Sequence, residues 1–240
     1  LGFLTMGIGG VWFATVRDKV TEPATAKRVQ SGVEPDPVRS SEPIGALVAM
    51  RQVLRIRDIW ILALCHMLFL GGYIGVIGYA PTYFTTIQGM SAADAGFVVS
   101  LIMWAYVVGA VVIPSVSDKI GLRKAFYFPG MFLAGACMVV SAFVLDVPLW
   151  TTAILWGIGG GAAALAFVVP LEMEGVGPSL AGSAVGIAIT AGYLGGVLAP
   201  VIGMWLVDVN PVTGFFFWGS CYMASAVLFL ALKETGPRSR

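Results

Sequence analysis

The sequence predicts an all-α polytopic membrane protein, built as a bundle of six transmembrane helices. Three observations predict this fold. The 240 residues are 58% hydrophobic and only 11% charged, with a mean hydropathy of +0.89, whereas soluble domains are about 25% charged. The basic residues collect in a few segments between long uncharged runs. Six of these runs have about the 20 apolar residues that cross a bilayer as a helix, namely 59–82, 95–117, 125–145, 149–170, 180–206 and 212–232.

The distribution of basic residues predicts which way the helices run. All 14 lysines and arginines fall within three segments, 17–57, 118–124 and 233–240. With the six spans between them, these segments face the same side of the membrane, which the positive-inside rule makes the cytoplasm. The opposite loops carry only Asp94, Asp146 and Asp208. We therefore expect an integral, multi-pass protein of the plasma (cell inner) membrane, surrounded by membrane lipid, with its C-terminus in the cytoplasm.

The chain divides into four parts by composition. Residues 1–16 are apolar but too short to span a bilayer, and they start without Met or a basic leader, so we expect the end of a truncated transmembrane helix. Residues 17–58 are expected to form a central cytoplasmic loop that contains a short interfacial helix. Residues 59–232 form the predicted six-helix bundle, and 233–240 a cytoplasmic tail.

Several functional classes are excluded by the residues present. The uncharged runs exclude a nucleic-acid binder, a disordered tail and a secreted disulfide scaffold. The three cysteines lie in apolar runs without CxxC spacing and are predicted to be reduced and buried. One histidine and no acid in the middle of a span leave neither a metal site nor a catalytic set. We therefore expect no enzyme activity and no cofactor.

The turn after the second span carries the most specific motif. It reads Pro114-Ser-Val-Ser-Asp118-Lys119-Ile-Gly121-Leu-Arg123-Lys124. This segment resembles the cytoplasmic gating motif of the major facilitator superfamily at Asp118, Lys119, Gly121, Arg123 and Lys124, while Pro114 replaces the first glycine of that motif. The alternative interpretation is plain positive-inside charge.

Other segments extend the resemblance over essentially the whole chain. Arg57-Asp58-Ile-Trp60 is similar to the start of the seventh helix in that family, and Lys233-Glu-Thr-Gly-Pro237 to the tail after the twelfth. The resemblance implies the C-terminal half of a secondary active transporter that works by alternating access. Its six helices would form a 3+3 inverted repeat, and its partners would be a small-molecule substrate and a missing N-terminal six-helix half.

The substrate class remains open at this stage. The segment from Leu171 to Pro200 resembles anion-uptake members such as nitrate or cyanate carriers, although the span 95–117 lacks the arginine that nitrate members carry. A small organic or inorganic anion is therefore one expectation, and a multidrug efflux member of the same family is the alternative. From another class, a seven-helix membrane receptor would require residues 1–16 to be a complete helix.

The gating motif suggests a physical mechanism. Gly121 provides the backbone freedom for a tight turn. We expect the Asp118 carboxylate to approach the positively polarised helix start at 178–183 or a basic residue of its own turn. Glu172 and Glu174 end the fourth span on the same side, as either cytoplasmic gate residues or solvated charges.

Four side chains within the spans are candidates for the substrate cavity. His66 and Tyr73 share one helical arc, opposite Gly71 and Gly75, which should pack on a neighbouring helix. The fourth span adds two aromatic side chains on one stripe, Trp156 and Phe167. The alternatives are a neutral histidine bonded inside the core and plain aromatic packing.

Glycine and proline residues predict close packing and bending. In the fifth span one arc contains Gly182, Gly186, Gly192, Gly196 and Pro200, which we assign to helix packing. In the fourth span, Gly159–Gly161 and Pro170 predict a helix that can bend or break.

Overall fold

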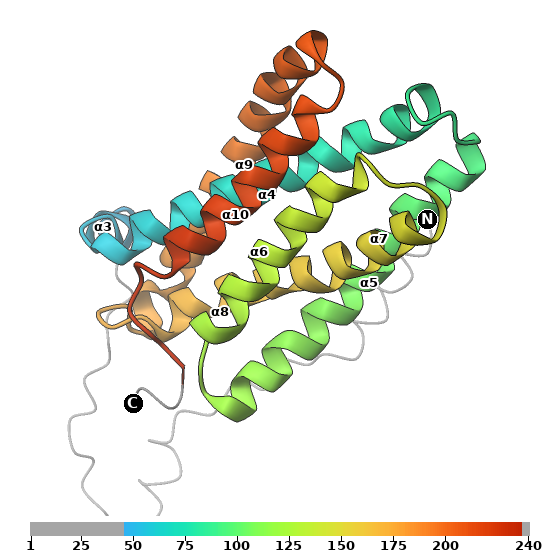
Figure 1. The fold of residues 1–240 in the computed structure, drawn as a ribbon. Coiled ribbons are helices and arrows are strands. Elements are labelled where there is room, and N and C mark those ends of the chain that lie inside the picture. Colours follow the sequence, from blue (N-terminus) through green and yellow to red (C-terminus); the bar gives the residue numbers. More distant parts are fainter. Residues whose placement is uncertain (1–45, 237–240) are drawn as a thin grey trace, which may run out of the picture. The chain divides into compact units, whose positions relative to one another are not determined.

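The computed structural model describes residues 46–236, and every regular element in this range is a helix (Figure 1). The predicted partial helix 1–16 lies outside the described residues, as do most of the central loop and residues 237–240. The helices are α3 (Ala46–Val53), α4 (Arg57–Thr86), α5 (Ala92–Ile120), α6 (Lys124–Ser141), α7 (Asp146–Gly160), a 3-10 turn (Gly161–Ala164), α8 (Leu165–Glu172), α9 (Pro178–Val209) and α10 (Thr213–Phe229).

Each of the six predicted spans corresponds to one helical segment, with α7, the 3-10 turn and α8 forming the fourth. Five segments within the described range are long and apolar enough to cross a membrane. The exception is α10, which is apolar but has 17 residues. At 1.5 Å per residue it is about 26 Å long, slightly less than the ~30 Å hydrocarbon core. Helices suit this setting because every backbone hydrogen bond is made within the segment.

The helices pack in a sequence that differs from their order along the chain. The neighbours run α9, α4, α10, α6, α7, α5, and Figure 1 shows α4, α10 and α6 lying side by side with α7 and α5 beyond them. Glycines permit the close approaches. A methyl group at Gly135 of α6 would lie 2.6 Å from the Gly219 carbonyl oxygen of α10, and one at Gly219 would lie 2.8 Å from that of Gly135.

Local sequence fixes both ends of α5, and the turn predicted at Gly121 is one of them. The Ser91 hydroxyl accepts a hydrogen bond from the Asp94 amide at 3.1 Å and so caps α5. At the other end of α5, Gly121 is in the left-handed conformation with φ +76°, and its amide bonds back to the Ser117 carbonyl. A side chain at this φ would be strained, so Gly121 allows the sharp turn into α6.

The predicted weak point of the fourth span is also present. The 3-10 turn at Gly161–Ala164 separates α7 from α8. Because a 3-10 helix turns about 120° per residue and an α-helix about 100°, four residues rotate the following side chains by about 80° extra. Trp156 before the turn is 2% exposed and Phe167 after it is 38% exposed. The structure therefore separates two side chains that regular helical geometry assigns to one stripe.

The glycines assigned to helix packing differ in what lies against them. Gly71, Gly75, Gly192 and Gly196 each lie against a neighbouring helix, and Pro200 lies inside α9. Gly182 and Gly186 differ, because no atom of the described residues lies within 4 Å of a methyl group placed on either. Helical periodicity places these glycines on one arc of α9, but side chains of α4 lie against this arc at Gly192, Gly195 and Gly196 and not at Gly182 or Gly186.

The short helix predicted in the central loop is α3, which packs on α9. Among its described side chains, Ala49 and Val53 are buried, whereas Met50 is 43% exposed. Arg51 and Arg55 are exposed on the remaining surface. The helix therefore has one face against the bundle and one exposed face, and its buried face includes Ala49 and Val53.

Candidate functional site

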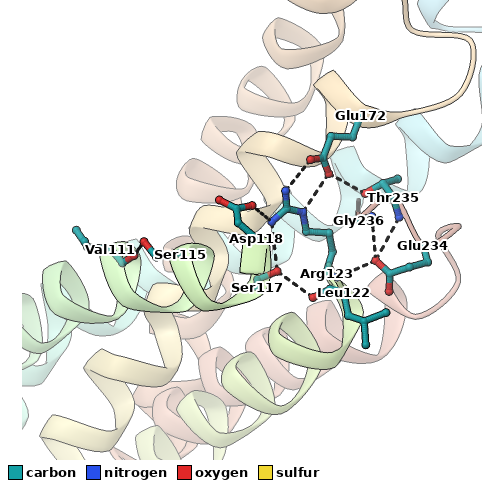
Figure 2. A network of polar contacts seen from close by, with 10 residues as sticks. All are labelled: Val111, Ser115, Ser117, Asp118, Leu122, Arg123, Glu172, Glu234, Thr235 and Gly236. Atoms are coloured by element: carbon teal, nitrogen blue, oxygen red, sulfur yellow. Dashed lines mark hydrogen bonds and ion pairs between the residues drawn. The ribbon is translucent and has the colours of Figure 1, made fainter. Parts of the chain in front are cut away.

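A polar cluster at the basic end of the bundle is centred on the Arg123 side chain, which is only 3% exposed (Figure 2). Its Nε and Nη2 donate to the two carboxylate oxygens of Glu172 at 3.0 and 2.6 Å. Its Nη1 donates to the Ser117 hydroxyl at 3.2 Å and pairs with the Asp118 carboxylate. This is the bidentate geometry that gives an arginine–carboxylate pair both strength and direction.

Three parts of the chain bring these groups together. Ser117 and Asp118 lie in the last turn of α5, and Gly121 reverses the chain so that Arg123 starts α6. Glu172 is the last residue of α8, 49 residues further along. Hydrogen bonding to Glu172 raises the pKa of Arg123 against the opposing effect of desolvation, and hydrogen bonding to Asp118 raises it further. Arg123 is therefore always charged.

The predicted Asp118 contact is found at one of the two expected places. Its carboxylate pairs with Arg123, a basic residue of its own turn, and the side chain is 60% exposed. Between Asp118 and the described residues of segment 178–183 the structure shows no hydrogen bond. The partner that ties the motif to a distant helix is Glu172, whose side chain is 15% exposed.

The tail after α10 is a part of the cluster that sequence reasoning missed. The Glu234 carboxylate accepts hydrogen bonds from the backbone amides of Arg123 at 2.7 Å and Lys124 at 3.2 Å. It thus supplies the N-terminal cap of α6, which no local side chain provides. The Thr235 hydroxyl donates to Glu172 at 3.2 Å. A signal existed, because an uncapped helix start and Glu234, the one acidic residue of the tail, lie on the same predicted side.

The remaining charged candidates lie at the edge of this cluster. Glu174 forms an exposed ion pair with Lys233 at 2.9 Å, and this hydrogen bond lowers the pKa of Glu174 and raises that of Lys233. Lys124 donates to the Leu230 carbonyl at the end of α10 at 3.0 Å, while Lys119 is exposed. Exposed pairs contribute little to stability, so Arg123 and Glu172 form the strongest link between helices here.

The four candidate cavity residues form two contact groups. His66 is 2% exposed, and its ring meets that of Phe167 edge-on with 4.9 Å between centroids. Tyr73 lies two turns further along α4, where its hydroxyl donates to the Met103 sulfur at 3.2 Å and its ring is 6.0 Å from that of Tyr106. Trp156 is buried in α7. The structure therefore joins His66 to Phe167, and Tyr73 to α5.

The arrangement at the basic end links α5, α6, α8 and the tail after α10 through charge-assisted hydrogen bonds. Such bonds can break and form again when packed helices move as rigid units. Among the described residues no group of three or more His, Cys, Asp or Glu side chains could hold a metal ion.

A family model described as the Major Facilitator Superfamily matches residues 1–200 and, in a second match, residues 62–239. The chain belongs to the Major Facilitator Superfamily. The alternative of a seven-helix receptor is therefore wrong. The turn 114–124 resembles the gating motif of the superfamily to which the chain belongs.

Two curated relatives within the superfamily are transporters by name. The chain is 29% identical over 171 residues to the "probable nitrate/nitrite transporter NarK2" of Mycobacterium tuberculosis. The aligned region covers 68% of this chain and 41% of that protein. The chain is 28% identical over 200 residues to the glycerol-3-phosphate transporter of Bacillus subtilis, covering 80% and 45%. The chain thus spans less than half the length of the curated relatives it matches.

A solved structure has the same fold. The inward-open xylose transporter XylE from E. coli superposes with a TM-score of 0.60 at 19% identity, over 78% of this chain and 49% of that one. At this identity the match supports the fold alone. Together with the family match, it identifies the chain as an integral, multi-pass membrane protein of the transporter superfamily.

Proposed function

We propose that this chain forms the C-terminal six-helix bundle of a secondary active transporter that moves a small anion by alternating access. The observation that carries the proposal is the buried ion pair between Arg123 and Glu172. It joins α6 to α8 at one end of the bundle, so that opening this end requires the pair to break or to move as one unit. The transporters named among its relatives carry nitrate or nitrite in one case and glycerol 3-phosphate in the other, and all of these substrates are anions.

The helix pairing supports an internal 3+3 repeat. In such a repeat α4 corresponds to α7, α5 to α9 and α6 to α10. The contact between α4 and α9 then corresponds to that between α7 and α5, and the contact between α4 and α10 to that between α7 and α6. The contact between α6 and α10 is unchanged by this exchange. Such a symmetry of contacts is expected of inverted repeats that rock around a shared site.

A second six-helix bundle is the proposed partner. Apolar side chains remain exposed along α5 and α9, including Trp104 at 71% and Val197 at 65%. Lipid covers part of such a surface, but the open glycines Gly182 and Gly186 on α9 suit close contact with another helix.

Uptake measurements on the full-length protein test the proposal. Vesicles containing the protein are given nitrate, nitrite, glycerol 3-phosphate, organic acids and cationic drugs in separate assays. We expect uptake of at least one anion above protein-free vesicles. Transport of the cationic drugs alone would favour the multidrug alternative, and transport of none of the compounds would overturn the proposed function.

The proposed orientation predicts opposite accessibility at the two ends of the bundle. A single cysteine replacing Asp146, at the acidic end, should react with a membrane-impermeant thiol reagent in intact cells. A cysteine replacing Lys119, at the basic end, should react only after the membrane is permeabilised. The native Cys65, Cys137 and Cys221 are buried, so the unsubstituted protein provides the background. Labelling of position 119 in intact cells would contradict the proposed orientation of the helices.

Replacing Asp118 by asparagine tests the gating motif. The change retains size and an acceptor oxygen but removes the negative charge beside Arg123. Because Asp118 is 60% exposed, we expect a loss of at most about 1 kcal/mol in stability. A shift of that size still changes a balance of two conformations several-fold. Transport turnover should therefore fall at an almost unchanged melting temperature, and wild-type turnover would leave the motif as positive-inside charge.

A further inference from the structure

His66 carries a buried polar atom that the fold does not use. Two buried side-chain atoms of the described residues have no hydrogen-bond partner, and one of them is Nε2 of His66. The residue lies nine positions after the start of α4, about 13 Å along the helix at 1.5 Å per residue. Desolvating a polar atom without giving it a partner opposes folding, so this position calls for a functional explanation.

The hydrogen bond on the other side of the ring determines which nitrogen carries the proton. Nδ1 of His66 lies 3.1 Å from the Leu62 carbonyl oxygen. A carbonyl can only accept, so Nδ1 is the donor and carries hydrogen in the neutral ring. Nε2 is then an unprotonated acceptor with a free lone pair. The edge-on contact with Phe167 holds the ring in this orientation.

The contacts of His66 that the described part of the chain shows are with uncharged residues. The helices that contact it are α8, through Phe167, and α9, where a methyl group at Gly192 would lie 3.5 Å from the His66 Cβ. Their titratable groups are Glu172, which binds Arg123 at the basic end, Tyr193, which is 63% exposed, and Asp208, which lies at the opposite end of α9. On α4 itself, Arg57 and Asp58 occupy the first turn, and the Cys65 thiol is bonded to the Ser225 carbonyl.

We propose that Nε2 of His66 is the proton-binding group that couples anion transport to proton transport. A proton from solution adds to the Nε2 lone pair and forms an N–H bond, which gives an imidazolium ion. The same bond breaks when the site faces the other compartment, and the proton returns to solvent. This inference rests on the proposed function as a small-anion transporter.

The coupling follows from the cost of an isolated charge inside the membrane. An imidazolium without a counter-ion is expensive there, and so is a lone anion. Each therefore favours the binding of the other, and the linkage is reciprocal. The entry proposed for the proton lies at Phe167, which contacts the imidazole and is 38% exposed. For a monovalent anion such as nitrate or nitrite, the transported species is thus a neutral pair of one proton and one anion.

Two substitutions separate proton binding from the structural hydrogen bond. His66→Asn places an amide donor near the position of Nδ1 and can retain the bond to Leu62, whereas His66→Gln places an amide near Nε2. Neither amide binds a proton near neutral pH. Ser220→Ala, at an exposed position of α10, is the control. All four full-length proteins are reconstituted in vesicles with an internal pH indicator, and nitrite, nitrate or glycerol 3-phosphate is added outside.

We expect the wild type and Ser220→Ala to move protons together with whichever anion is taken up, and to accumulate it when the outside is acidic. Both His66 variants should lose proton movement and acid-driven accumulation while still exchanging labelled anion down its gradient. Anion uptake without proton movement in the wild type would overturn the inference, as would normal proton movement in either His66 variant. Uptake of none of the anions would overturn the proposed function and this inference with it.

Discussion

Replacing Arg123 by alanine is expected to destabilise the protein by about 3 kcal/mol and to abolish transport, because removing one member of a buried ion pair leaves the other charge uncompensated. Arg123 is 3% exposed and its guanidinium satisfies two carboxylates and one hydroxyl. Without it, Glu172 remains in a partly buried site. The link between α6 and α8 is lost at the same time.

Three further variants distinguish the pair from a general effect of charge. Lys119→Ala removes the same charge from the same turn at an exposed position, so its melting temperature should stay near that of the wild type. Arg123→Lys keeps the charge but replaces the planar fork by a single ammonium group, and we expect an intermediate loss. In Arg123→Ala combined with Glu172→Gln, the second change should restore part of the stability.

The measurements are the thermal unfolding of the purified full-length protein in detergent and anion uptake in vesicles. Equal losses for Arg123→Ala and Lys119→Ala would show that net charge, and not the buried pair, sets the stability of this end of the bundle. Additive effects of the changes at Arg123 and Glu172 would contradict a direct interaction between the two side chains.

The second large effect is expected where α4 meets α9. A methyl group at Gly71 would lie 2.8 Å from both the Gly195 carbonyl oxygen and the Ala199 side chain. Because the first of these atoms belongs to the backbone, relief requires the helices to separate. We expect Gly71→Ala to cost about 1–3 kcal/mol, as for other overpacked cores, even though alanine favours a helix over glycine by about 1 kcal/mol.

Gly78 of the same helix provides the matched control. No atom of the described residues lies within 4 Å of a methyl group at this position, so Gly78→Ala gains the helix propensity without the clash. Gly71→Ala should therefore lower the melting temperature and Gly78→Ala should raise it. Equal melting temperatures would contradict the close approach of α4 and α9 at Gly71.

Some features of the fold could be predicted from the sequence and others could not. The six spans, the capped start of α5 at Ser91 and the left-handed turn at Gly121 could all be predicted. The partner of Arg123 and the role of Glu234 could not, since the paired groups are 49 and 111 residues apart. Helical periodicity also could not show that Gly192 lies against α4 while Gly182 and Gly186 face no atom of the described residues.

The sequence alone determined the membrane spans and the predicted orientation. Hydropathy, charge and helix capping each depend on residues that are close together in the chain, so they can be read without knowledge of the fold. The sequence also carried the motif that relates the chain to its superfamily. Only the tertiary structure decided which carboxylate receives Arg123, which glycines touch another helix, and which nitrogen of His66 is left without a partner. These depend on how distant helices approach one another, and a helical pattern specifies the face of a helix but not what lies against it.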